Sequence, residues 1–157
     1  MNLDQIVSLI GKSERDEQVV AMLTELGVKQ PIPRPKFRGT NSNIVLRHSQ
    51  MELEFVFKPI EKFKGYAKDF LEGEQFFHTM FPRPSKEDVA KGIAMPYGVN
   101  LQESLEWHLK KFGTVEKSFP DWNRYRWLFG SHRVLLEFVD DDNLVIRDVT
   151  YSFNDGS

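Results

Sequence analysis

The clearest pattern of hydrophobic and polar positions predicts an amphipathic helix over residues 101–112. Asn100 and Glu103 are typical of a helix N-cap, because a carboxylate three residues on can accept a hydrogen bond from the amide of the cap. Gly113 follows at the point where helices commonly end in a left-handed conformation. The apolar residues that share one face of this helix are Leu101, Leu105, Leu109 and Phe112.

Three extended runs follow this helix and predict a three-stranded antiparallel meander. The first gap, Gly130-Ser131, is typical of a tight hairpin turn, and the second, Asp140–Asn143, of a polar one. Alternation within the first run places Tyr125, Trp127 and Phe129 on one strand face, which we expect to be the core. The three runs are Arg124–Phe129, His132–Val139 and Leu144–Phe153.

The first 28 residues predict two short helices that form a hairpin. Asn2 with Gln5 matches a capping box for the first helix. Ser13 is the expected cap of the second, which Gly27 ends.

The middle of the chain changes to the period of a strand. In Met51–Phe57 the apolar residues alternate with Glu52 and Glu54, which we expect on the solvent face. Glu74–Phe81 predicts a second strand, and Lys86–Lys91 a short helix.

These elements predict an α+β fold, with an N-terminal helical hairpin, a mainly antiparallel sheet and one central amphipathic helix packed on it. We expect a single domain over residues 1–157, built from the hairpin (1–28), strands and loops (29–95) and the helix plus meander (96–157). A chain of this length can bury a sizeable core. The 13 phenylalanines favour strands over a helical bundle.

Charge and composition narrow the expected partners and location. With 21 basic and 23 acidic residues the net charge is −2, so no global field attracts nucleic acid or an anionic membrane. Met1–Gln5 carries an acid where an export signal has basic residues, and no apolar run approaches the length of a membrane span. We therefore expect a cytoplasmic protein without a membrane partner. Lys29, Arg34, Lys36 and Arg38 form a local basic cluster. We interpret it as a solvated segment, and whether it binds a ligand stays open.

No assembled catalytic or metal-binding pattern is present in the sequence. The chain has no cysteine, and its histidines lack the spacing of metal ligands, so we expect no metal and no cofactor. Glu52 with Glu54 suits a solvated strand face better than an acid–base pair. Ser131 lies in a predicted turn and not in a nucleophile motif. The four histidines are His48, His78, His108 and His132.

The opening segment Asn2–Lys12, together with Leu26-Gly27-Val28, resembles the start of small bacterial immunity proteins found beside polymorphic toxins. In that group two helices precede an extended basic segment and a sheet. The resemblance implies a cytoplasmic protein that binds a cognate toxin.

The C-terminal segment is similar to the helix-plus-meander unit of β-lactamase-inhibitor-like and outer-membrane-assembly lipoprotein modules. In such proteins the sheet and its loops hold a partner protein. The chain departs from that pattern at Thr114, where a proline is expected, and in having no lipoprotein cysteine. The similarity is carried by Pro96–Val99, Leu101–Gly113, Trp127, Leu135–Val139 and Asp140–Asn143.

The sequence therefore predicts a non-catalytic inhibitor that occludes the active site of a bacterial toxin. Trp122, in the loop before a strand, is the expected aromatic anchor. Acidic side chains are expected to meet a basic cleft of the toxin and speed association. Two alternatives stay open: a small hydrolase in which His78 or His132 meets a glutamate, and an adaptor of a secretion system. The expected partner-binding residues are Glu52, Glu54, Trp122, Asp140, Asp141 and Asp142.

Overall fold

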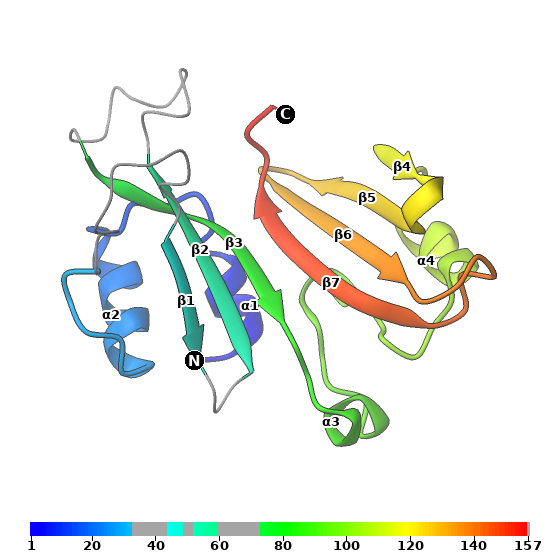
Figure 1. Ribbon diagram of the computed structural model, residues 1–157, viewed down its shortest axis with the longest axis horizontal. Coiled ribbons are helices and arrows are strands. Elements are labelled where there is room, and N and C mark those ends of the chain that lie inside the picture. Colours follow the sequence, from blue (N-terminus) through cyan, green and yellow to red (C-terminus); the bar gives the residue numbers. More distant parts are fainter. Residues whose placement is uncertain (33–43, 49–51, 60–72, 157) are drawn as a thin grey trace.

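The computed structural model describes residues 1–32, 44–48, 52–59 and 73–156. These residues form a seven-stranded sheet in the order β1-β2-β3-β7-β6-β5-β4, with every pair antiparallel (Figure 1). The elements are α1 (Leu3–Val7), α2 (Glu17–Glu25), β1 (Ile44–His48), β2 (Leu53–Pro59), β3 (Gln75–Pro82), α3 (Lys86–Ala90), the 3-10 helix η3 (Pro96–Gly98), α4 (Leu105–Phe112), β4 (Lys117–Phe119), the 3-10 helix η4 (Pro120–Trp122), β5 (Arg124–Phe129), β6 (His132–Phe138) and β7 (Ile146–Phe153).

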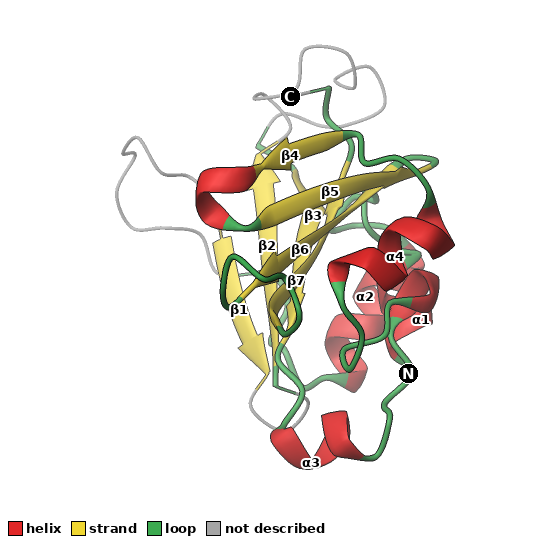
Figure 2. Cartoon of the chain, turned by 90° about the vertical axis from the view of Figure 1, so that its right-hand side faces the viewer, coloured by secondary structure: helices red, strands yellow, loops and turns green. Residues whose placement is uncertain are grey.

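Helices α1, α2 and α4 lie on the same side of the sheet (Figure 2). The predicted α+β fold with an antiparallel sheet is confirmed. The helical hairpin of α1 and α2, and the central position of one helix, stay predictions. Helix α4 contacts β5, where the Phe112 ring meets Trp127 at 5.6 Å and Phe129 at 5.2 Å between centroids.

Alternation along the strands gives the sheet two different faces. In β2, Leu53, Phe55 and Phe57 are buried against the helices, and the residues between them are half-buried. In β6, the side chains of Val134, Leu136 and Phe138 enter the same core. We call the opposite side, which includes Lys58 of β2 and Arg133 of β6, the polar face. No α-helix in the described part of the chain covers it (Figure 2).

Two β-bulges interrupt the alternation. Val56 pairs with Thr79 and Phe57 with Phe77, so His78 is an extra residue in β3. Glu137 pairs with Asp148 and Phe138 with Ile146, so Arg147 is an extra residue in β7. A bulge turns consecutive side chains toward one side of a sheet, and each of these brings two polar side chains to the polar face.

The start of α4 differs from the sequence prediction. Its N-cap is Ser104, whose hydroxyl accepts a hydrogen bond from the Trp107 amide at 3.3 Å. The Asn100 side chain accepts from the amide of Gln102 at 3.0 Å and so closes a turn before the helix. Leu101 accordingly lies in that turn. Gly113 ends the helix at φ 81°, as predicted.

The second helix also begins later than predicted. The Asp16 carboxylate accepts from the amide of Gln18 at 2.9 Å and is the N-cap, whereas Ser13 forms an isolated bridge with Phe76. The capping box of Asn2 and Gln5 is confirmed for α1.

Most predicted strands are present, and two short edge strands, β1 and β4, were not predicted. The short helix after Ser85 is confirmed as α3. Arg34, Lys36 and Arg38 of the basic cluster lie outside the described residues. Within the described chain, no helix has the length and apolar character that crossing a membrane requires.

Candidate functional site

The polar face contains a shallow depression of about 610 Å³ at the centre of the sheet. Among the described residues, its lining includes six basic side chains and three carboxylates, an excess of three positive charges in a chain whose net charge is −2. The basic residues are Lys58, Arg83, Arg124, Arg126, Arg133 and Arg147, and the acidic ones are Glu137, Asp148 and Asp155.

A buried polar network forms one end of this depression. The Asp155 carboxylate accepts a hydrogen bond from Arg133 Nη1 at 3.1 Å, and its other oxygen lies 3.0 Å from His78 Nε2. The side chains of Arg133, His78 and Asp155 are only 7%, 7% and 8% exposed. The second ring nitrogen of His78 lies 2.6 Å from the Thr79 hydroxyl. The Asp155 carboxylate therefore links His78 of β3 to Arg133 of β6, two strands that β7 separates.

Burial and the neighbouring positive charge of Lys58 favour the neutral form of His78. Burial lowers the pKa of His78 below its usual 6.5, and the positive charge of Lys58 lowers it further. Lys58 Nζ lies 3.5 Å from His78 Nε2. The hydrogen bond to Asp155 acts in the opposite direction but does not reverse the shift. A neutral His78 can donate from Nε2 to Asp155 and accept the Thr79 hydroxyl at Nδ1.

Further arginines on this face are held by carboxylates on a neighbouring strand or directly before one. Glu137 of β6 accepts from Arg124 Nε at 2.6 Å and lies 3.4 Å from Arg147 Nη1. Arg126 of β5 makes a two-pronged contact with Glu116, of which the second hydrogen bond is 3.1 Å long. This contact lowers the pKa of Glu116. The guanidinium groups are thereby fixed in position across the sheet.

A second candidate surface lies at the end of the β6–β7 hairpin, beside η4 (Figure 1). The Phe138 amide donates to the Asn123 carbonyl at 2.9 Å, which joins the two segments. Trp122 is 62% exposed, and the three aliphatic side chains of this surface are 50% to 60% exposed. We call this surface the hairpin end; it comprises Trp122, Val139, Asp140, Asp141, Asp142, Leu144 and Val145.

The three aspartates of the hairpin end are exposed, and none forms an ion pair within the described chain. The Asp142 carboxylate only accepts from the Leu144 amide at 3.3 Å. Trp122 stacks on Phe119 at 6.4 Å between centroids and faces the Arg124 guanidinium at 5.5 Å. The indole therefore has a preferred orientation while most of its surface stays accessible.

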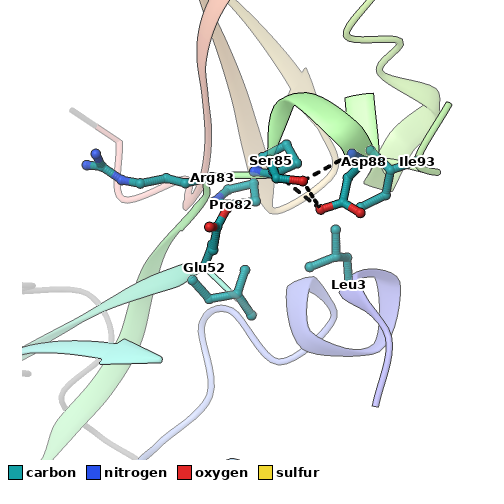
Figure 3. A pocket seen from close by; sticks show the side chains of 9 residues that line it. Leu3, Glu52, Pro82, Arg83, Ser85, Asp88 and Ile93 are labelled. Carbon is teal, nitrogen blue, oxygen red and sulfur yellow. Dashed lines mark hydrogen bonds between the residues drawn. The ribbon is translucent and has the colours of Figure 1, made fainter. Parts of the chain in front are cut away.

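Glu52 and Glu54 lie away from the hairpin end. Glu52 precedes β2 in a turn at φ 49°, not on the strand as predicted, and lines a separate cavity of about 380 Å³ (Figure 3). Opposite it, Ser85 and Asp88 form the capping box of α3. Glu54 is half-buried and accepts from Arg47 Nε at 2.7 Å, so this carboxylate is already paired. The structure thus brings Trp122 and the three aspartates together but separates the two glutamates from them.

The other buried histidines stabilise the core. His108 Nδ1 donates to the Ser104 carbonyl at 2.7 Å, and Nε2 accepts from the Asn100 amide at 3.2 Å. His132 is hydrogen-bonded to the Tyr97 hydroxyl and lies 3.1 Å from the Ile10 carbonyl. Burial lowers the pKa of both imidazoles. In the described part of the chain no group of three or more possible ligands could hold a metal ion.

Sequence reasoning did not identify the network of His78, Arg133 and Asp155. The hydrogen-bonded pairs are separated by 77 and 22 positions along the chain, and neither separation corresponds to a recognisable motif. An indirect signal was the alternation in His132–Val139, which sets Arg133 on the face opposite Val134. No family model, curated protein or solved structure matches the chain.

Proposed function

We propose that the protein is a non-catalytic inhibitor of the immunity type, which binds a cognate bacterial toxin and occludes its active site. The observation that carries the proposal is the hairpin end, where exposed apolar side chains surround an unpaired acidic turn. An aromatic anchor with apolar neighbours supplies the desolvated centre of an interface. Adjacent carboxylates select a partner with a basic surface and accelerate its association.

The side chains of the hairpin end are partly ordered before a partner binds. Trp122 is the last residue of the 3-10 helix η4 and its ring stacks on Phe119, which reduces the side-chain freedom that binding has to remove. The aspartates occupy a turn fixed at both ends by strands. A basic cleft of a toxin is the partner whose charge complements this turn.

The test is affinity capture with the tagged protein from its native lysate, using two matched variants. One carries Trp122→Ala with Asp140, Asp141 and Asp142 changed to asparagine. The other carries Lys58→Met and Arg147→Gln on the polar face. We expect the wild type and the polar-face variant to retain one stoichiometric partner with a toxin domain, and the hairpin-end variant to lose it.

The same variants can be tested in cells that express the captured partner. Protection by the wild type and the polar-face variant, but not by the hairpin-end variant, supports inhibition through this surface. Equal retention by all three proteins, or a lysate that yields no partner, would contradict the proposal.

A second candidate function, a hydrolase, rests on the contacts of His78 with Asp155 and Thr79. The histidine meets an aspartate here, whereas the sequence-based hypothesis paired a histidine with a glutamate. Both ring nitrogens are engaged, and His78 and Thr79 are 5% and 7% exposed, so a substrate has little access to the hydroxyl. Ester hydrolysis that is lost in Thr79→Val would favour this candidate over inhibition.

A further inference from the structure

We propose that the depression on the polar face binds a small phosphate-bearing ligand. This site is separate from the hairpin end, so the inference does not depend on the proposed inhibitor function. Its volume of about 610 Å³ lies within the range of small-ligand sites. The lining has an excess of positive charge although the chain is weakly acidic, so basic groups are concentrated on this face.

The hydrogen-bonding chemistry of the lining matches phosphate. Guanidinium groups present several N–H donors in a planar fork that fits phosphate oxygens. Hydroxyl groups of Thr150 and Ser152 line the same depression and add neutral donors. Lys58 contributes an ammonium group beside His78. The described lining thus offers donors from β2, β6 and β7.

Both β-bulges of the sheet open onto this depression. The first brings the consecutive residues His78 and Thr79 to the lining, and the second brings Arg147 and Asp148. Regular alternation would direct one member of each pair into the core. Bulges are common beside binding and active sites because they redirect side chains in this way. Their convergence on one depression is an observation independent of its charge.

The lining favours a small ligand over a nucleic acid strand. Sheets that bind single strands present aromatic side chains on which successive bases stack. Among the lining residues that the structure describes, the only aromatic ring apart from the imidazole of His78 is that of Phe81. The cationic groups are also gathered around one depression, where they suit a compact polyanion.

Partial burial strengthens these contacts. Arg133 is 7% exposed and its guanidinium is held by Asp155, so this positive group is already positioned before a ligand binds. Burial is the main cause of the lowered pKa of His78, and the positive charges of Lys58 and Arg133 lower it further. Electrostatic attraction falls less steeply with salt in a partly buried site than on an exposed surface.

The test is calorimetric titration of the intact protein with inorganic pyrophosphate. The site variant is Lys58→Met with Arg147→Gln, two changes outside the buried contact of Arg133 with Asp155. The matched control is Lys91→Gln with Lys110→Gln, which removes the same charge from exposed side chains of the α3 C-cap and α4. Circular dichroism spectra of all three proteins verify the fold.

We expect saturable binding by the wild type and the control, and a dissociation constant at least about tenfold weaker for the site variant. Absence of saturable binding at millimolar pyrophosphate would overturn the inference. An equal loss in the control would show attraction to net charge alone and would also overturn it. Binding of a twelve-nucleotide thymidine strand without binding of pyrophosphate would assign the face to nucleic acid instead.

Discussion

The polar face has an excess of basic side chains, whereas the charged side chains of the hairpin end are acidic. The two surfaces also differ in whether these charges form ion pairs. On the polar face, carboxylates such as Glu137 and Asp155 accept hydrogen bonds from basic groups of neighbouring strands. At the hairpin end, Asp140, Asp141 and Asp142 are exposed and form no ion pair within the described residues. The first arrangement contributes to folding as well as to any binding. The second leaves its charges and apolar groups available to another molecule.

The largest expected difference in stability follows from removing one carboxylate from each surface. Asp155→Ala leaves Arg133 and His78 buried without their shared acceptor, and we expect a loss of about 3–5 kcal/mol in the free energy of unfolding. Asp141→Ala at the hairpin end should change it by less than about 0.5 kcal/mol. Urea unfolding measures both. A loss below about 1 kcal/mol for Asp155→Ala would remove the contrast between the surfaces.

Acid should destabilise the fold through its buried imidazoles. Burial lowers the pKa of His78, His108 and His132 below 6.5. Between pH 6.5 and the lowered values the unfolded chain binds more protons than the folded chain, so stability is greatest above pH 6.5 and is lost as pH falls.

Each histidine contributes a slope of up to about 1.4 kcal/mol per pH unit. Unfolding free energies between pH 7.5 and pH 5 measure the total slope. His78→Gln should reduce it. A slope that His78→Gln does not alter would show that His78 is not held neutral.

A smaller loss of stability is expected from a change at Glu137. This half-buried carboxylate on the polar face accepts a hydrogen bond from Arg124 and lies near Arg147. Glu137→Gln should cost about 1–2 kcal/mol, because an acceptor of charged donors is weakened in a half-buried position. Asp148→Asn is the matched control, since its pair with Arg147 is exposed and worth less than about 1 kcal/mol. Equal losses of stability in thermal denaturation would mean that the burial of the carboxylate does not determine the strength of these contacts.

The smallest effect on stability is expected from the apolar part of the hairpin end. Leu144→Ser with Val145→Thr should change the free energy of unfolding by less than about 0.5 kcal/mol for each residue, because both side chains are exposed. Leu136→Ala in the core of β6 should cost about 2–5 kcal/mol in the same assay. Binding of the captured partner should weaken at least about tenfold in the Leu144/Val145 variant. Unchanged affinity would place the interface elsewhere.

Sequence patterns predicted the elements that local chemistry determines. Alternation gave β2, β3 and the β5–β7 meander, and it placed Trp127 correctly in the core. The exposure of Trp122 and the turn at Asp140–Asn143 also agree with the structure. The prediction of Asn100 as the N-cap of α4 was wrong: the N-cap is Ser104, four residues later, and Asn100 closes the turn before the helix.

Contacts between distant strands were not accessible from the sequence. Glu54 was expected to be free on a solvent face, but pairing of β1 with β2 sets Arg47 opposite it. His78 meets Asp155 only because β3 pairs with β7, and it faces the polar side only because of a bulge. No local pattern encodes such a bulge or the register of strands far apart in the chain.

The most direct test of the central claim is amide hydrogen exchange on the protein alone and in complex with its captured partner. The account predicts new protection in residues 119–123 and 139–146, with the strands of the polar face unchanged. Protection confined to β2, β3 and β6, with the hairpin end exchanging as in the free protein, would contradict it.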